Sequence, residues 1–103
     1  FYTVSAHTKI LMDRCQSLWV KKTWAANREP APAVRRKGLF ISAGATRGKR
    51  LFDGTLLSVR YFFDTLDMDL WKTLLYRGLE HEGEAQARPD YLNEAYQAGR
   101  DLA

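Results

Sequence analysis

Cysteine is nearly absent from this sequence of 103 residues. Because Cys15 is the only cysteine, the chain can form neither an internal disulfide nor a metal site with several cysteine ligands. The two histidines, His7 and His81, are far apart and lack the spacing of metal ligands, so we expect no metal site. Low cysteine content suits a reducing compartment, and we expect a cytoplasmic protein.

Long hydrophobic runs are also missing, since no apolar stretch approaches the roughly 18 residues that are needed to span a bilayer. The first twenty residues are amphipathic and interrupted by polar side chains, so we expect neither a signal peptide nor a membrane partner. Hydrophobic residues make up 46% of the chain and charged residues 27%, as in a folded domain rather than a disordered chain. The length allows one domain at most.

Acidic residues are too few to balance the basic ones, and the net charge is +4 with a pI of about 9.4. Such a charge favours anionic partners, which include phosphates, nucleotides and nucleic acids, without choosing among them. The range 20–37 is rich in cations and contains Pro30 and Pro32, which interrupt regular structure. We therefore expect a basic connector over 20–37.

The periodicity of apolar residues predicts three helices. The first runs from Ser5, whose hydroxyl can cap it, to about Trp19. A second apolar stripe covers 49–66, and its helix can begin after Asp53 as a cap. Pro89 occupies a position that is tolerated in the first turn and opens a final helix.

Two segments between these helices predict strands. The range 38–43 is almost continuously apolar, as in a parallel strand that is covered on both faces. The range 69–76 includes polar positions that suit the edge of a sheet, and a polar loop follows it. Helices that alternate with strands indicate an α/β fold with a parallel sheet and helices on both faces. Two strands are too few for such a sheet, so we expect other strands before Phe1.

Functional signal is concentrated at two turns, over 1–6 and 43–48. In a parallel sheet both turns would lie at the carboxyl ends of strands, where ligands bind. Phe1 and Tyr2 could stack on a flat heterocycle, and helix amides beyond them favour electron-rich atoms. The two glycines of the second turn, Gly44 and Gly48, would let the backbone approach a ligand closely.

These segments resemble the family of NADPH-dependent FMN reductases and iron–sulfur flavoproteins. The range 1–14 is similar to the loop and helix after the family's third strand, where an aromatic residue precedes a Ser/Thr-Ala pair and a helix with a Lys and an Asp-Arg pair. The residues at the places of that Lys and that pair are Lys9, Asp13 and Arg14. The range 37–48 resembles the family's fourth strand and glycine-bearing loop, and 91–99 resembles its last helix.

The resemblance implies a flavodoxin-like three-layer α/β/α fold of which residues 1–103 form the carboxyl-terminal half. It implies an FMN-dependent NAD(P)H oxidoreductase of the flavin reductase, quinone reductase or iron–sulfur flavoprotein type. Hydride transfer would pass through bound FMN, with no side chain acting as catalytic acid or base. The residues that the resemblance places around FMN are Phe1, Tyr2, Thr3, Val4, Ser5, Gly44, Ala45, Thr46 and Gly48.

Some family features differ or are missing here. Ala43 stands where the family often has a glycine, so it is not among the expected contacts. The Ser/Thr-rich loop that binds the flavin phosphate and the cysteine cluster of the iron–sulfur branch are not in these residues. We therefore expect the chain alone to bind FMN weakly or not at all, and to be inactive as an enzyme. The relatives are usually dimers or tetramers, so we expect a homo-oligomer.

Other interpretations compete with this one. A glycine-containing turn is usually only a turn, and Phe1 and Tyr2 can equally be core residues that finish a strand. The basic connector with Trp24 could track a nucleic-acid backbone, but no nucleic-acid motif supports this and a solvated surface is the commoner case. A third alternative is a fragment or interaction module without enzymatic activity. The flavin interpretation requires the turns over 1–6 and 43–48 to lie side by side.

Three further groups are assigned ordinary roles. Cys15 is expected to face the core, and His7 to be a solvated or capping residue in the first helical turn. Glu80, Glu82 and Glu84 alternate in a loop and are expected to be solvated. None of these groups predicts a catalytic site.

Overall fold

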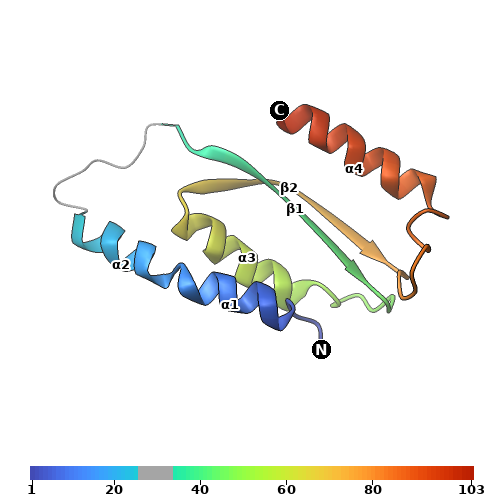
Figure 1. The fold of residues 1–103 in the computed structure, drawn as a ribbon, viewed down its shortest axis with the longest axis horizontal. Helices are drawn as coiled ribbons and strands as arrows, with labels where there is room; N and C mark the ends of the chain where they lie inside the picture. The colour runs from blue at the N-terminus through green and yellow to red at the C-terminus, as the bar shows by residue number, and fades with distance from the viewer. Residues whose placement is uncertain (26–33) are drawn as a thin grey trace.

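The computed structural model describes residues 1–25 and 34–103, and it contains four helical segments and a pair of strands in those residues (Figure 1). In chain order the elements are α1 (Ala6–Arg14), α2 (Gln16–Ala25), β1 (Arg36–Gly44), α3 (Asp53–Thr65), β2 (Met68–Arg77) and α4 (Pro89–Leu102). Helices therefore alternate with strands, as the sequence predicts. No helix in this part of the chain is long and apolar enough to cross a membrane.

The strands β1 and β2 are parallel and form one two-stranded sheet. Their register pairs Ile41 with Leu74 and Ala43 with Tyr76, so both strands end at the same edge. One irregularity occurs after Gly38, where Trp71 is passed over in the pairing. Helix α4 lies on one side of the sheet, while α3 lies on the other side with α1 and α2 beyond it (Figure 1). The predicted α/β class with a parallel sheet is confirmed.

One cluster of buried side chains fills the space between the sheet and α4. It contains Leu74 and Tyr76 from β2 and Ala98 from α4. Tyr91 stacks on Tyr76 with 4.3 Å between ring centroids, and the Tyr76 hydroxyl donates a hydrogen bond to the carbonyl of Tyr91. Burial raises the pKa of Tyr76, with the nearby Glu94 contributing in the same direction.

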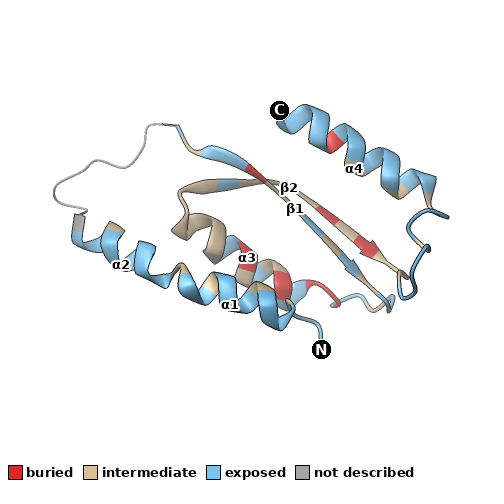
Figure 2. Ribbon diagram, viewed as in Figure 1, coloured by how far each residue is buried: buried red, intermediate tan, exposed pale blue. Residues whose placement is uncertain are grey.

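A second buried group lies between the sheet and α3, on the opposite face. Val59 of α3 is 1% exposed, and Leu51 and Phe52 before that helix are also buried (Figure 2). The ring of Phe63 lies directly over Gly38, leaving no room for a side chain there. Residues of one strand alternate between faces, so Gly38 and Gly44 face α3 whereas Leu39 packs toward α4.

Two helix starts agree with the sequence, and one differs slightly. The Ser5 hydroxyl accepts a hydrogen bond from the amide of Thr8, so the predicted cap is confirmed. Pro89 opens α4 as predicted. Asp53 is the first residue of α3 rather than its cap, which is Phe52 without a side-chain hydrogen bond. The carboxylate of Asp53 instead pairs with Arg50 at 3.0 Å.

The single helix expected over 5–19 is wrong in its extent. A turn at Cys15 divides it, because the Cys15 amide shares the carbonyls of Leu11 and Met12. The second part, α2, continues to Ala25. Residues 20–25 of the expected connector are therefore helical, and residues 36–37 belong to β1. Residues 34–35 precede β1 without regular structure, and positions 26–33, with Pro30 and Pro32, lie outside the described residues.

The apolar face expected to be buried along the first helix is largely exposed to solvent (Figure 2). Ile10 and Leu11 are each more than half exposed, and α1 contains no buried residue. Cys15, which was expected to face the core, is half-buried. The reason is the orientation of α1, because the residues that it places beside α3 are Lys9, Met12 and Asp13 rather than Ile10 and Leu11.

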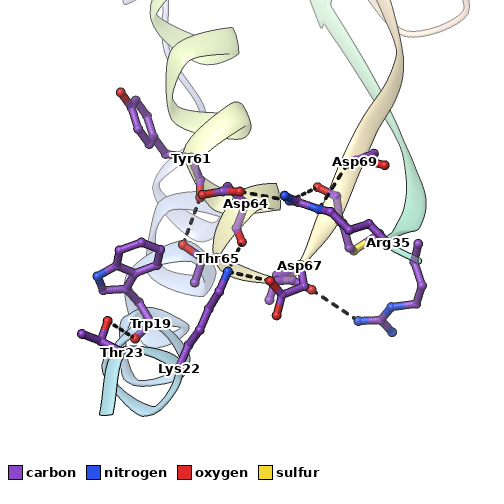
Figure 3. A network of polar contacts seen from close by, with 12 residues as sticks. Trp19, Lys22, Thr23, Arg35, Tyr61, Asp64, Thr65, Asp67 and Asp69 are labelled. Carbon is purple, nitrogen blue, oxygen red and sulfur yellow. Dashed lines mark hydrogen bonds and ion pairs between the residues drawn. The ribbon is translucent and has the colours of Figure 1, made fainter. Parts of the chain in front are cut away.

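Ion pairs join α2 and the start of β1 to the turn between α3 and β2 (Figure 3). Lys22 pairs with Asp67 at 2.5 Å and also donates to the carbonyl of Asp64. Arg35 Nη2 pairs with Asp64 at 3.0 Å, and its Nε lies 3.2 Å from Asp69 Oδ1, at ion-pair distance but outside hydrogen-bond geometry. These contacts hold α2 near the amino-terminal edge of the sheet, opposite the edge at which both strands end.

Candidate functional site

A hollow of about 270 Å³ lies at the carboxyl-terminal end of β1. We call it the carboxyl-edge hollow. Its lining comes from three places in the sequence: the first residues of the chain, the end of β1 with its following loop, and the start of α3. The lining residues are Phe1, Tyr2, Thr3, Ser42, Ala43, Gly44, Ala45, Thr46, Leu51, Phe52 and Thr55. Segments about forty positions apart in the chain therefore form one rim.

Tyr2 is held in an unusual backbone conformation beside this hollow. Its φ angle is 56°, a left-handed value that a bulky residue rarely adopts. Two glycines make room for it: a Cβ on Gly54 would lie 3.0 Å from the Tyr2 carbonyl oxygen, and one on Gly48 would lie 2.9 Å from its hydroxyl. Strained conformations of this kind cluster at ligand sites. The strained backbone of Tyr2 thus lies at the rim of the carboxyl-edge hollow.

The floor of the hollow is anchored by residues that are nearly inaccessible to solvent. Phe52 is 4% exposed and Thr55 is 3% exposed. Gly44 packs against Leu51, whose Cδ2 would lie 2.7 Å from a Cβ at position 44. A side chain there would displace Leu51 from the lining. The floor is therefore close-packed and fixed in position before any ligand binds.

Arg77, the last residue of β2, supports the loop behind the hollow. Its Nε donates to the carbonyl oxygen of Gly48 at 3.2 Å, and its guanidinium lies over the ring of Phe52 at 5.0 Å from the centroid. A cation over an aromatic face is favourable, and more so when it is partly withdrawn from water. Arg77 thus connects the loop after β1 to the floor of the hollow.

The chemistry of the lining is aromatic and hydroxylic. Three side chains are aromatic, Phe1, Tyr2 and Phe52, and among the described residues no charged side chain takes part. Four more carry hydroxyl groups that can donate or accept hydrogen bonds: Thr3, Ser42, Thr46 and Thr55. Such a surface suits a flat, uncharged heterocycle with hydrogen-bonding edges.

Six of the nine expected FMN-contact residues line this hollow: Phe1, Tyr2, Thr3, Gly44, Ala45 and Thr46. Gly48 lies beside the Tyr2 hydroxyl but is not part of the lining. Val4 and Ser5 do not line it either, because the chain has by then turned into α1, where Ser5 serves as the cap.

Five lining residues were not expected from the sequence: Ser42, Ala43, Leu51, Phe52 and Thr55. Ala43, which was left out of the expected contacts, is thus part of the rim. Phe52 and Thr55 could have been predicted as lining residues, because they flank the start of the helix that follows the glycine-containing loop. The sequence offers no such indication for Ser42. Whether a strand residue lines a hollow depends on which face of the sheet its side chain lies on, and the sequence does not show this.

The other candidate groups occupy ordinary structural positions. Glu84, expected to be solvated, accepts hydrogen bonds from the amides of Glu80 and His81 and closes the turn after β2. These hydrogen bonds, first that from His81, lower the pKa of the Glu84 carboxyl. The described residues contain no group of three or more His, Cys, Asp or Glu side chains that could hold a metal ion.

The basic connector is partly neutralised within the molecule. Lys22 pairs with Asp67 in the α3–β2 turn, and Arg35 pairs with Asp64 in the last turn of α3 (Figure 3). Lys37 lies over the ring of Trp71. Arg28 is outside the described residues. The engaged cations are thus less free to contact a phosphate backbone than the sequence suggests.

Comparisons with family models, with curated proteins and with solved structures found no match to this chain. The functional interpretation accordingly depends on the sequence motifs and on the geometry of the carboxyl-edge hollow.

Proposed function

We propose that this chain is part of a flavodoxin-like, FMN-dependent NAD(P)H oxidoreductase of the cytoplasm and that the carboxyl-edge hollow receives the flavin ring. One observation carries the proposal: Phe1–Thr3 and Gly44–Thr46, about forty positions apart, line the same hollow at the carboxyl end of a parallel strand. That edge is where ligands bind in parallel α/β sheets. The sequence motifs at the same two segments resemble those of FMN reductases.

The lining fits the ring system of FMN but not its phosphate. Aromatic faces and hydroxyl groups match a flat heterocycle with polar edges, whereas no cationic side chain of the described residues lines the hollow to receive an anion. The volume of about 270 Å³ is also below the roughly 300–1,000 Å³ of pockets that enclose a whole drug-sized ligand. The hollow would therefore hold one portion of the cofactor.

Bound FMN would supply the redox chemistry by accepting a hydride from NAD(P)H and passing two electrons to an acceptor. The chain's own residues would bind and orient the ring. Tyr2 would set one wall, and Gly48 and Gly54 leave the room that it occupies there. Thr46 and the backbone of the loop would offer hydrogen bonds to the ring edge, and the buried Phe52 would exclude water from beneath it.

Titration of the purified chain with riboflavin, followed by quenching of flavin fluorescence, tests the proposal directly. We expect Tyr2→Ala to weaken binding roughly five-fold or more, because an aromatic contact is worth about 1 kcal/mol. Tyr61→Ala is the matched control, since Tyr61 is 71% exposed on α3 and does not line the hollow. Because the chain alone is expected to bind flavin weakly, the titration is extended to the solubility limit of riboflavin. The proposal fails if Tyr2→Ala and Tyr61→Ala both bind riboflavin as the unaltered chain does.

A further inference from the structure

Helix α3 begins at the carboxyl-edge hollow without a side chain that caps it. Its cap position is occupied by Phe52, which lines the hollow and makes no side-chain hydrogen bond to the helix. A cap is ordinarily Ser, Thr, Asp or Asn, whose side-chain oxygen accepts from the amide of the second or third helical residue. Phe52 has no such oxygen, so the start of α3 lacks the acceptor that a capping side chain provides.

The amides of the second and third residues of α3, Gly54 and Thr55, remain open. The amide before them, that of Asp53, donates to a carbonyl of the preceding turn, and the amide after them, that of Leu56, donates to the carbonyl of Phe52. Neither Gly54 nor Thr55 donates its amide to an acceptor in the part of the chain that the structure describes. Open amides at a helix start, together with the helix dipole, favour an electron-rich atom.

The hydroxyl of Thr55 adds a further donor at the same place. Thr55 is 3% exposed and lines the hollow. The hydroxyls of Thr23 and Thr65 donate to carbonyls four positions earlier, whereas that of Thr55 has no hydrogen-bond partner among the described residues. The only side-chain atom of those residues that is both unpartnered and fully inaccessible is Arg35 Nε, so the Thr55 oxygen keeps access to the hollow. A hydroxyl that is withdrawn from water without a partner costs free energy, which a ligand in the hollow would offset.

Two neighbouring acceptors do not occupy these donors. The carboxylate of Asp53 pairs with Arg50 at 3.0 Å, is more than half exposed and does not line the hollow. The carbonyl oxygen of Tyr2 would lie 3.0 Å from a Cβ on Gly54, yet it accepts no hydrogen bond from the described residues. Thr55 is therefore left as a polar group inside an aromatic lining.

We infer that the start of α3, with Thr55 as the specificity-determining residue, binds the carbonyl-bearing edge of the flat heterocycle that enters the carboxyl-edge hollow. Hydroxyl and amide donors match a carbonyl oxygen and a neighbouring ring nitrogen. An uncharged edge fits because no charged side chain of the described residues lines the hollow. The inference rests on the proposed function for the identity of the ring, since in a flavin this edge is the pyrimidine ring with its two carbonyl groups.

The stability of Thr55→Val tests the inference without a ligand. Valine keeps the branched shape, has a similar helix propensity and removes the hydroxyl. Because that hydroxyl has no partner in the folded chain, we expect the unfolding temperature to stay unchanged or to rise by up to about 4 °C. Thr65→Val is the matched control in the same helix, since its hydroxyl donates to the carbonyl of Tyr61 and it does not line the hollow. Its unfolding temperature should not rise.

Binding of riboflavin and of uracil tests the inference with a ligand. Uracil carries a comparable pair of carbonyl groups and dissolves to far higher concentration, so that weak binding is measurable from the NMR shifts of the Gly54 and Thr55 amides. Riboflavin is followed by fluorescence quenching. We expect Thr55→Val to weaken the binding of both ligands about five-fold, as the loss of one hydrogen bond does. Thr55→Ser, which restores the hydroxyl, should bind within about two-fold of the unaltered chain, and Thr65→Val should bind as that chain does.

The two proposals fail on different results. A lower unfolding temperature for Thr55→Val overturns the inference, because it would show that the hydroxyl is used within the chain. Uracil that shifts neither amide, or that binds Thr55→Val as it binds the unaltered chain, overturns it as well. Riboflavin binding that depends on Tyr2 would in those cases leave the proposed function intact. Uracil binding that depends on Thr55, without riboflavin binding that depends on Tyr2, would sustain the subsite and overturn the proposed function.

Discussion

Replacement of Gly38 by alanine should destabilise the fold, although strand propensity predicts the opposite. Glycine weakens the interior of a strand, so alanine there would ordinarily gain about 0.5–1 kcal/mol. In this structure a Cβ at position 38 would lie 2.2 and 2.8 Å from two ring carbons of Phe63. Carbon atoms prefer a separation of roughly 3.5–4.0 Å, so the ring would have to move by about 1 Å or more.

The magnitude follows from the two opposing terms. Overpacking of a close-packed interior typically costs about 1–3 kcal/mol, which exceeds the gain from removing the glycine. We therefore expect Gly38→Ala to lower the free energy of unfolding by about 1–2 kcal/mol. In a domain of this size, each 1 kcal/mol corresponds to roughly 4–8 °C in the unfolding temperature. The assay is urea unfolding followed by circular dichroism.

Two further variants make the test specific. Phe63→Leu should relieve the clash, so that the double variant Gly38→Ala with Phe63→Leu loses less stability than the sum of the single variants, by about 1 kcal/mol. Gly99→Ala is the control, since a Cβ at that position in α4 meets nothing within 4 Å. It should stabilise the chain by about 1 kcal/mol through helix propensity. A neutral or stabilising Gly38→Ala would refute the packing of α3 described above.

Two other predictions concern local hydrogen bonds. Ser5→Ala should lower the free energy of unfolding by about 1 kcal/mol and reduce the helical circular dichroism signal, because the hydrogen bond from the Thr8 amide to the Ser5 hydroxyl is lost. An unchanged free energy of unfolding would contradict this cap. The pKa of Glu84 is lowered in the folded state, so its contribution to stability is present above its ordinary pKa of 4.5 and is lost as the pH falls below it. Glu84→Gln should therefore reduce the loss of stability between pH 7 and pH 3, measured as urea midpoints, and an identical pH dependence in both chains would count against the turn contacts.

Much of the local structure could be predicted from the sequence because its causes act within a few residues. The Ser5 hydroxyl reaches an amide three positions away, and the ring of Pro89 fixes its own backbone angle at the start of α4. The continuous apolar run at 38–43 likewise indicated a strand of a parallel sheet, and β1 is paired in parallel with β2.

The burial of the first helix could not be predicted in the same way. Helical periodicity shows that Ile10 and Leu11 share a face, but it does not say what that face contacts. In the structure α1 turns Lys9, Met12 and Asp13 toward α3, and Ile10 and Leu11 remain exposed. The turn that divides the helix at Cys15 could not be predicted either, because the apolar periodicity continues across it.

The sequence by itself determined the order of helices and strands, the turn at 44–48 and the aromatic character of the chain's first residues. Only the tertiary structure decided that these two segments share a rim and that Phe52 and Thr55 form the floor beneath them. The physical reason is the distance along the chain over which each interaction acts. Capping, backbone restriction and periodicity act over a few residues, whereas a rim built from segments about forty positions apart depends on the path of the whole chain.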